Sequence, residues 1–134
     1  MNKVAFWNRC RHDRRFFWEK CVRIRSQLED GSFAAIPFIP NPEQDIVIRW
    51  LEDQEADKQP IRFIILKARQ LGMTTLAMAL WFHMCTFRDL VRCQVIGHRK
   101  EDTRKISQIP ILMNEELPRP IRSRCKAKNV GMGL

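Results

Sequence analysis

The predicted fold depends mainly on residues 61–75, IRFIILKARQLGMTT, near the middle of a chain of 134 residues. Residues 61–66 are almost wholly apolar, rich in β-branched side chains and preceded by Pro60. A short run of this composition predicts a buried central strand. Residues 67–73 then form a loop, and residues 74–87 are apolar nearly all round, which predicts a well-covered helix. The order of strand, loop and helix is typical of a βαβ unit.

Downstream, residues 91–97 alternate apolar and polar side chains and predict a second strand. Residues 101–116 predict a further helix, kinked or broken near Pro110. We therefore expect an α/β fold with an open parallel sheet. Two strands are too few for a complete sheet of this kind, so we expect the domain to be incomplete.

Upstream, residues 16–28 predict an amphipathic helix that ends at Gly31, because apolar side chains recur at helical spacing at Phe17, Cys21, Ile24 and Leu28. Residues 34–42 contain three prolines and should be extended. A second helix should start with Asn41 as its N-cap and Pro42 in its first turn. We accordingly predict a helical lead-in over residues 1–40 and an incomplete ATPase domain over residues 41–134.

The chain has a formal net charge of +9, and its basic regions lie on either side of an acidic segment at residues 41–60. This distribution suits a protein that works beside a polyanion, although a solvated basic face explains the charge equally well. The five cysteines show no zinc-like spacing. We expect reduced thiols, a cytosolic protein and no membrane span.

The loop at residues 67–75 partly matches the phosphate-binding pattern GxxxxGK[ST] between a strand and a helix. Gly72 takes the place of the second glycine, and Thr74 supplies the hydroxyl that helps to hold Mg²⁺. Met73 occupies the usual lysine position, and Lys67 stands at the first glycine. The cation that reaches the phosphates must then come from the front of the loop, where Arg69 is a second candidate. The alternative is an ordinary strand-to-helix turn with a surface lysine and arginine.

The string Lys-Ala-Arg-Gln-Leu-Gly-x-Thr-Thr at residues 67–75 resembles the ATP-binding loop of the large subunits of tailed-phage DNA-packaging terminases. The string Asn-Pro-x-Gln at residues 41–44 is similar to the glutamine motif of that family. Residues 16–38, 95–100 and 117–129 resemble, in order, the lead-in, the second strand with its turn, and the stretch before the next strand. The resemblance therefore covers nearly the whole chain.

The resemblance implies a role for each matching residue. Lys67 would contact the β- and γ-phosphates, Thr74 would bind Mg²⁺, and Arg69 would act as an arginine finger in cis. Gln44 would recognise adenine. The implied nucleotide-binding set is Gln44, Lys67, Ala68, Arg69, Gln70, Leu71, Gly72, Met73, Thr74 and Thr75. Two alternatives stay open: Gln44 as a first-turn helix residue only, and Arg69 paired with a carboxylate.

The resemblance also implies a partial RecA-like P-loop NTPase fold and an ATPase that drives double-stranded DNA into procapsids in the host cytoplasm. Its partners would be DNA, a portal protein, a small terminase subunit and further copies of itself in a ring. The sequence has no apolar strand ending in Asp-Glu and nothing like the family's nuclease domain, so we expect this chain alone to be inactive. Two other functions stay open: another P-loop DNA motor such as a helicase-like ATPase, and a non-catalytic basic adaptor that has lost nucleotide.

Overall fold

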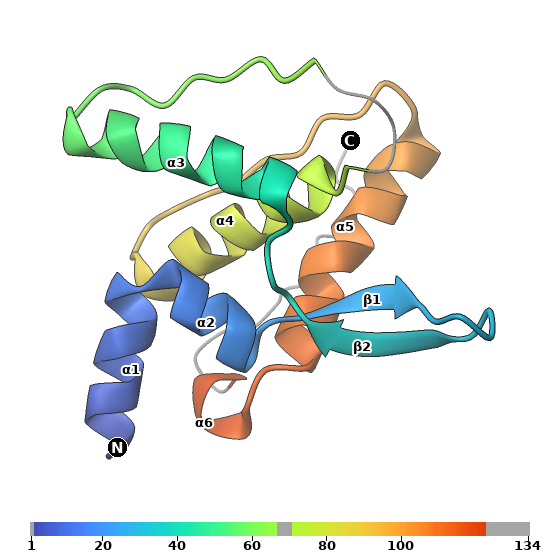
Figure 1. Cartoon of the computed structure of the whole chain (residues 1–134), viewed down its shortest axis with the longest axis horizontal. Coiled ribbons are helices and arrows are strands. Elements are labelled where there is room, and N and C mark those ends of the chain that lie inside the picture. Colours follow the sequence, from blue (N-terminus) through green and yellow to red (C-terminus); the bar gives the residue numbers. More distant parts are fainter. Residues whose placement is uncertain (1, 67–70, 123–134) are drawn as a thin grey trace.

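The structure is a computed structural model that describes residues 2–66 and 71–122. Two N-terminal helices lead into a β-hairpin, and three longer helices and a short one follow (Figure 1). The elements are α1 (Lys3–His12), α2 (Arg14–Cys21), β1 (Arg23–Gln27), β2 (Phe33–Pro37), α3 (Pro42–Ala56), α4 (Met73–Phe87), α5 (Lys100–Glu115) and α6 (Arg119–Arg122). None of the helices in this described part has the length and apolar character needed to cross a bilayer.

Short polar side chains set the helix boundaries. The Asp13 side chain accepts a hydrogen bond from the backbone N–H of Phe16 at 2.9 Å, which caps α2 directly after α1 has ended. Asn41 caps α3, and Pro42 begins it. The predicted start of α3 is thereby confirmed. The helices predicted over residues 74–87 and 101–116 are also confirmed, since α4 and α5 cover them to within one residue, with Pro110 inside α5.

The predicted parallel RecA-like sheet is wrong. The sheet found in residues 2–66 and 71–122 is a two-stranded antiparallel hairpin, in which Arg23 of β1 lies opposite Pro37 of β2. Residues 61–66 and 91–97, the two predicted strands, form no strand. A β-branched run becomes a strand only when a neighbour accepts its hydrogen bonds and covers its side chains, and neither segment has such a neighbour in the described chain.

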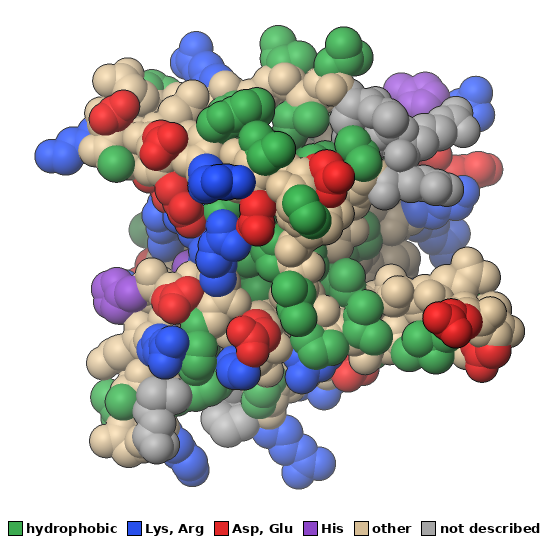
Figure 2. Space-filling model, viewed as in Figure 1, with side chains coloured by type: hydrophobic (Ala, Val, Ile, Leu, Met, Phe, Trp, Pro, Cys, Tyr) green, Lys and Arg blue, Asp and Glu red, His purple; other side chains and the backbone are tan. Residues whose placement is uncertain are grey.

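Residues 61–66 are largely exposed, whereas the predicted parallel sheet would have buried them. The side chains of Ile64 and Leu66 are 101% and 100% exposed. Apolar side chains stand out along the edge of the molecule where residues 57–66 run past α3 (Figures 1 and 2). The run is apolar, but the prediction that it is buried is wrong.

The helix predicted over residues 16–28 is wrong in its second half. Helix α2 ends at Cys21, and Val22 already has extended backbone angles. The following residues pair with β2 through a turn in which Gly31 has a φ of 81°. Pairing along the hairpin satisfies the backbone of residues 23–27 outside a helix. The lead-in over residues 1–40, expected to be helical, thus contains the hairpin as well.

The core lies where α2, α4 and the base of the hairpin meet, with Met113 of α5 fully buried in the same cluster. Trp18 is its largest fully buried side chain. The indole Nε1–H donates to the carbonyl oxygen of Ala79 at 3.2 Å, and the ring packs edge-on against Phe38. One contiguous core therefore joins the N-terminal lead-in to the long helices.

Candidate functional site

The start of α4 has a backbone conformation that only glycine adopts without strain. Gly72 is the N-cap residue, with φ 67° and ψ 14°. Its carbonyl oxygen accepts the first helical hydrogen bond, from the N–H of Leu76 at 3.0 Å, and no described side chain caps this end. The first N–H groups of a helix have no partner within it and carry partial positive charge. This end of α4 is therefore suited to an anion.

A buried glutamine fixes the position of this helix start. The Nε2 atom of Gln44 donates to the carbonyl oxygen of Gly72 at 2.8 Å, and Gln44 is only 3% exposed. Its Oε1 atom accepts from the N–H of Asn41 at 2.9 Å, and the N–H of Gln44 donates to the Asn41 side chain at 2.8 Å. A Cβ atom on residue 72 would lie 2.7 Å from Gln44 Nε2. The Gln44 amide thus joins the start of α3 to the start of α4, and the Asn41 amide adds a 3.4 Å hydrogen bond to the carbonyl oxygen of Leu71.

The predicted site residues fall into two groups. Lys67, Ala68, Arg69 and Gln70 lie outside the described residues. Gln44 lies in the first turn of α3 and bonds to Gly72, and the remaining predicted residues lie at the start of α4: Leu71, Gly72, Met73, Thr74 and Thr75. The contact between Gln44 and Gly72 was not predicted, although both residues were named.

Met73 and Thr74 are exposed to very different degrees. Met73, at the usual lysine position, is 8% exposed and belongs to the hydrophobic core, where an ammonium group would be costly to bury. Thr74 is exposed, so its hydroxyl is available to a ligand. Mg²⁺ prefers oxygen ligands and takes most of them from waters and phosphate oxygens. One protein hydroxyl is therefore a suitable single ligand in its coordination shell. Within residues 2–66 and 71–122 no group of three or more His, Cys, Asp or Glu side chains is arranged to hold a metal.

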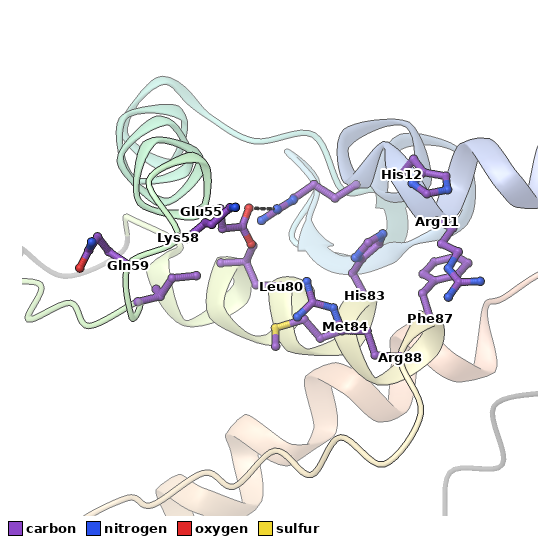
Figure 3. A pocket seen from close by; sticks show the side chains of 12 residues that line it. Arg11, His12, Glu55, Lys58, Gln59, Leu80, His83, Met84, Phe87 and Arg88 are labelled. Carbon is purple, nitrogen blue, oxygen red and sulfur yellow. Dashed lines mark hydrogen bonds and ion pairs between the residues drawn. The ribbon is translucent and has the colours of Figure 1, made fainter.

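A concave region lies at the opposite end of α4, beside His83 (Figure 3). The Nε2 atom of His83 lies 2.9 Å from the carbonyl oxygen of Cys10, and it must carry a proton because a carbonyl oxygen only accepts. Burial lowers the pKa of His83 below 6.5, and the charges of Arg14 and Arg88 lower it further. The hydrogen bond to Cys10 and the charge of Glu55 act in the opposite direction. The folded state therefore favours neutral His83.

We expect acid to destabilise the fold through His83. A histidine whose folded-state pKa is lowered binds a proton more readily when unfolded, so its contribution is complete above pH 6.5 and is lost as the pH falls toward the folded-state pKa. Urea midpoints measured by circular dichroism should fall as the pH is lowered from 7 to 5. In His83→Gln, which keeps a donor but does not titrate, that fall should be smaller. An identical fall in both proteins would contradict the assignment.

Comparisons with protein-family models, with curated proteins and with solved structures find no match to this chain. The described residues 2–66 and 71–122 are mainly helical, with one β-hairpin and a glycine-started helix that a buried glutamine holds in place.

Proposed function

We propose that this chain is the nucleotide-binding N-terminal part of a DNA-packaging terminase large subunit, the ATP-driven motor that moves double-stranded DNA into procapsids. The observation that carries the proposal is the 2.8 Å hydrogen bond from Gln44 to Gly72, which lie 28 residues apart. It joins the glutamine motif to the end of the phosphate-binding loop, the two elements on which the resemblance depends. The proposal uses this helix start and does not require the parallel sheet.

In this proposal the N–H groups at the start of α4 contact the phosphates of ATP, and Lys67 supplies the cation. Thr74, which is exposed, contributes its hydroxyl to Mg²⁺. Arg69 approaches the γ-phosphate. The partners are DNA, a portal protein, a small terminase subunit and other copies of the chain in a ring. Because the sequence has no apolar strand ending in Asp-Glu, we expect nucleotide binding without turnover.

One observation favours a second function, a basic adaptor that keeps the fold but has lost nucleotide. Met73 is buried in the core at the position where phosphate-binding loops usually place lysine. If Lys67 does not replace that cation, the helix start keeps only its backbone N–H groups for an anion. The two functions thus differ in whether Lys67 changes affinity for ATP.

The test is a titration of the 134-residue chain with a fluorescent ATP analogue and Mg²⁺. The Lys67→Ala variant should bind about tenfold or more weakly, because a charge-assisted hydrogen bond contributes roughly 1.5–3 kcal/mol. Lys3→Ala, which removes the same charge from the exposed start of α1, is the matched control and should bind like wild type. Negligible binding by all three proteins would instead support the adaptor. Detectable Mg²⁺-dependent hydrolysis would contradict the expectation of no turnover.

A further inference from the structure

A basic pocket of about 660 Å³ lies at the C-terminal end of α4. Figure 3 shows Glu55 and Lys58 on one side of it, Arg11 and His12 on the other, and side chains of α4 between them. The pocket is lined by Arg11, His12, Arg14, Glu55, Lys58, Gln59, Ile61, Leu80, His83, Met84, Phe87 and Arg88. None of these residues belongs to the predicted nucleotide site.

Positive charge exceeds negative charge in this pocket. Its lining has four Lys or Arg side chains and one carboxylate, that of Glu55. Arg14 is bonded to Glu55, whereas Arg11, Lys58 and Arg88 have no ion-pair partner among residues 2–66 and 71–122. The lining therefore has an excess of three full positive charges.

The ends of three helices oppose this charge but do not cancel it. Helices α1, α3 and α4 end beside the pocket, at His12, Ala56 and Phe87. Each helix C-terminus is equivalent to about half a negative charge, so together they offset roughly half of the excess. The positive charge of the side chains around the pocket exceeds the negative charge of its helix ends. The net positive charge that remains is available to an anion.

The chemistry of the lining points to phosphate in particular. Guanidinium groups present planar pairs of N–H donors that match two phosphate oxygens, and Arg11 and Arg88 are both exposed. Arg14 is held by Glu55 but has further N–H donors for a ligand. Leu80, Met84 and Phe87 add apolar surface, on which the non-ionic part of a phosphate ester can rest.

We propose that this pocket binds phosphate groups, at a second site separate from the start of α4. Helix α4 has 15 residues and is therefore about 22 Å long, so one ligand phosphate cannot contact both ends. The ligand is a phosphate-bearing molecule, either the backbone of a nucleic acid or a small free phosphate compound. The proposal is independent of nucleotide binding at Gly72.

The experiment compares the double variant Arg11→Gln/Arg88→Gln with Arg25→Gln/Arg49→Gln, which removes the same charge from exposed positions outside the pocket. Pyrophosphate is titrated while the ring resonances of the histidines are followed by NMR. A fluorescein-labelled DNA duplex is titrated in parallel by anisotropy. Circular dichroism verifies that each variant is folded, and Lys67→Ala separates this pocket from the loop.

We expect pyrophosphate to shift the His12 and His83 resonances in wild type, in the Arg25/Arg49 control and in Lys67→Ala. In Arg11→Gln/Arg88→Gln the affinity should fall about tenfold or more. A matching loss of duplex binding only in this variant would identify nucleic acid as the source of the phosphate. If pyrophosphate binds in the pocket but the two double variants bind DNA equally well, the source of the phosphate is a free phosphate compound.

Three results would overturn the proposal. One is that neither ligand binds more weakly to Arg11→Gln/Arg88→Gln than to wild type. Another is an equal loss in both double variants, since this would show that net charge, and not the pocket, attracts the ligand. Loss of pyrophosphate binding in Lys67→Ala alone would place the ligand at the loop and also exclude the pocket.

Discussion

Replacing Trp18 with alanine is expected to remove a large share of the protein's folding stability. The side chain is fully buried, lies edge-on to Phe38 with ring centroids 5.4 Å apart, and donates to the carbonyl of Ala79. Removing a buried tryptophan costs about 3–5 kcal/mol. A domain of this size has roughly 5–15 kcal/mol in total. Trp18 contacts both the residue that follows the hairpin and α4. The cavity left by removing its side chain would therefore lie between these two parts of the core.

The measurement is urea denaturation followed by far-ultraviolet circular dichroism, which does not depend on the number of tryptophans. Trp50→Ala is the matched control, since that side chain is 56% exposed on α3. An exposed substitution of this kind changes stability by about 0.5 kcal/mol or less. If Trp18→Ala and Trp50→Ala had the same urea midpoint as wild type, the described core would be incorrect.

The helices were predictable from sequence because their determinants are local. Asn41 and Pro42 mark the start of α3 through contacts within one turn, and no distant residue is needed. Residues 74–87 are apolar enough to be helical and covered in almost any arrangement, and α4 covers them. These predictions were confirmed because caps and side-chain periodicity act over short stretches of the chain.

The strands were not predictable because pairing depends on distant partners. Residues 61–66 have the composition of a central strand, yet no described segment pairs with them. Conversely, residues 23–27 contain two arginines, a serine and a glutamine and do not look like a strand, but they pair with β2. The apolar stripe from Phe17 to Leu28 favoured one long helix, and no local rule showed that the hairpin would end it at Cys21.

The candidate sites also differ in how far they were predictable from sequence. Gly72 and Gln44 were each named from short motifs, whereas their contact depends on how α3 and α4 pack. The basic pocket has no motif at all, because its lining comes from α1, the start of α2, the end of α3 with the segment after it, and the end of α4. From the sequence alone we could predict a general excess of basic residues, but not where they converge in the fold.

Replacing Gln44 with alanine should cost about 1–3 kcal/mol in the free protein, because the N–H of Asn41 is left unpaired while the carbonyl of Gly72 keeps its bond from Leu76. The substitution leaves the carbonyl of Gly72 and the N–H of Asn41 without their side-chain partner. Glu52→Ala, at an exposed position of the same helix, is the control and should change stability little. Urea denaturation of the apo protein measures both. An unchanged Gln44→Ala midpoint would show that the amide does not hold the helix start.

A double-mutant cycle with Gly72→Ala tests the contact itself. The added Cβ would lie 2.7 Å from Gln44 Nε2, and residue 72 has a φ of 67°, which alone costs alanine about 1–2 kcal/mol. In Gln44→Ala the clash disappears, so the double variant should lose less stability than the sum of the single losses, by about 0.5–3 kcal/mol. Additive losses would mean that the two residues do not touch. Coupling would show that Gln44 positions the start of α4, which makes this contact a property of the folded chain itself.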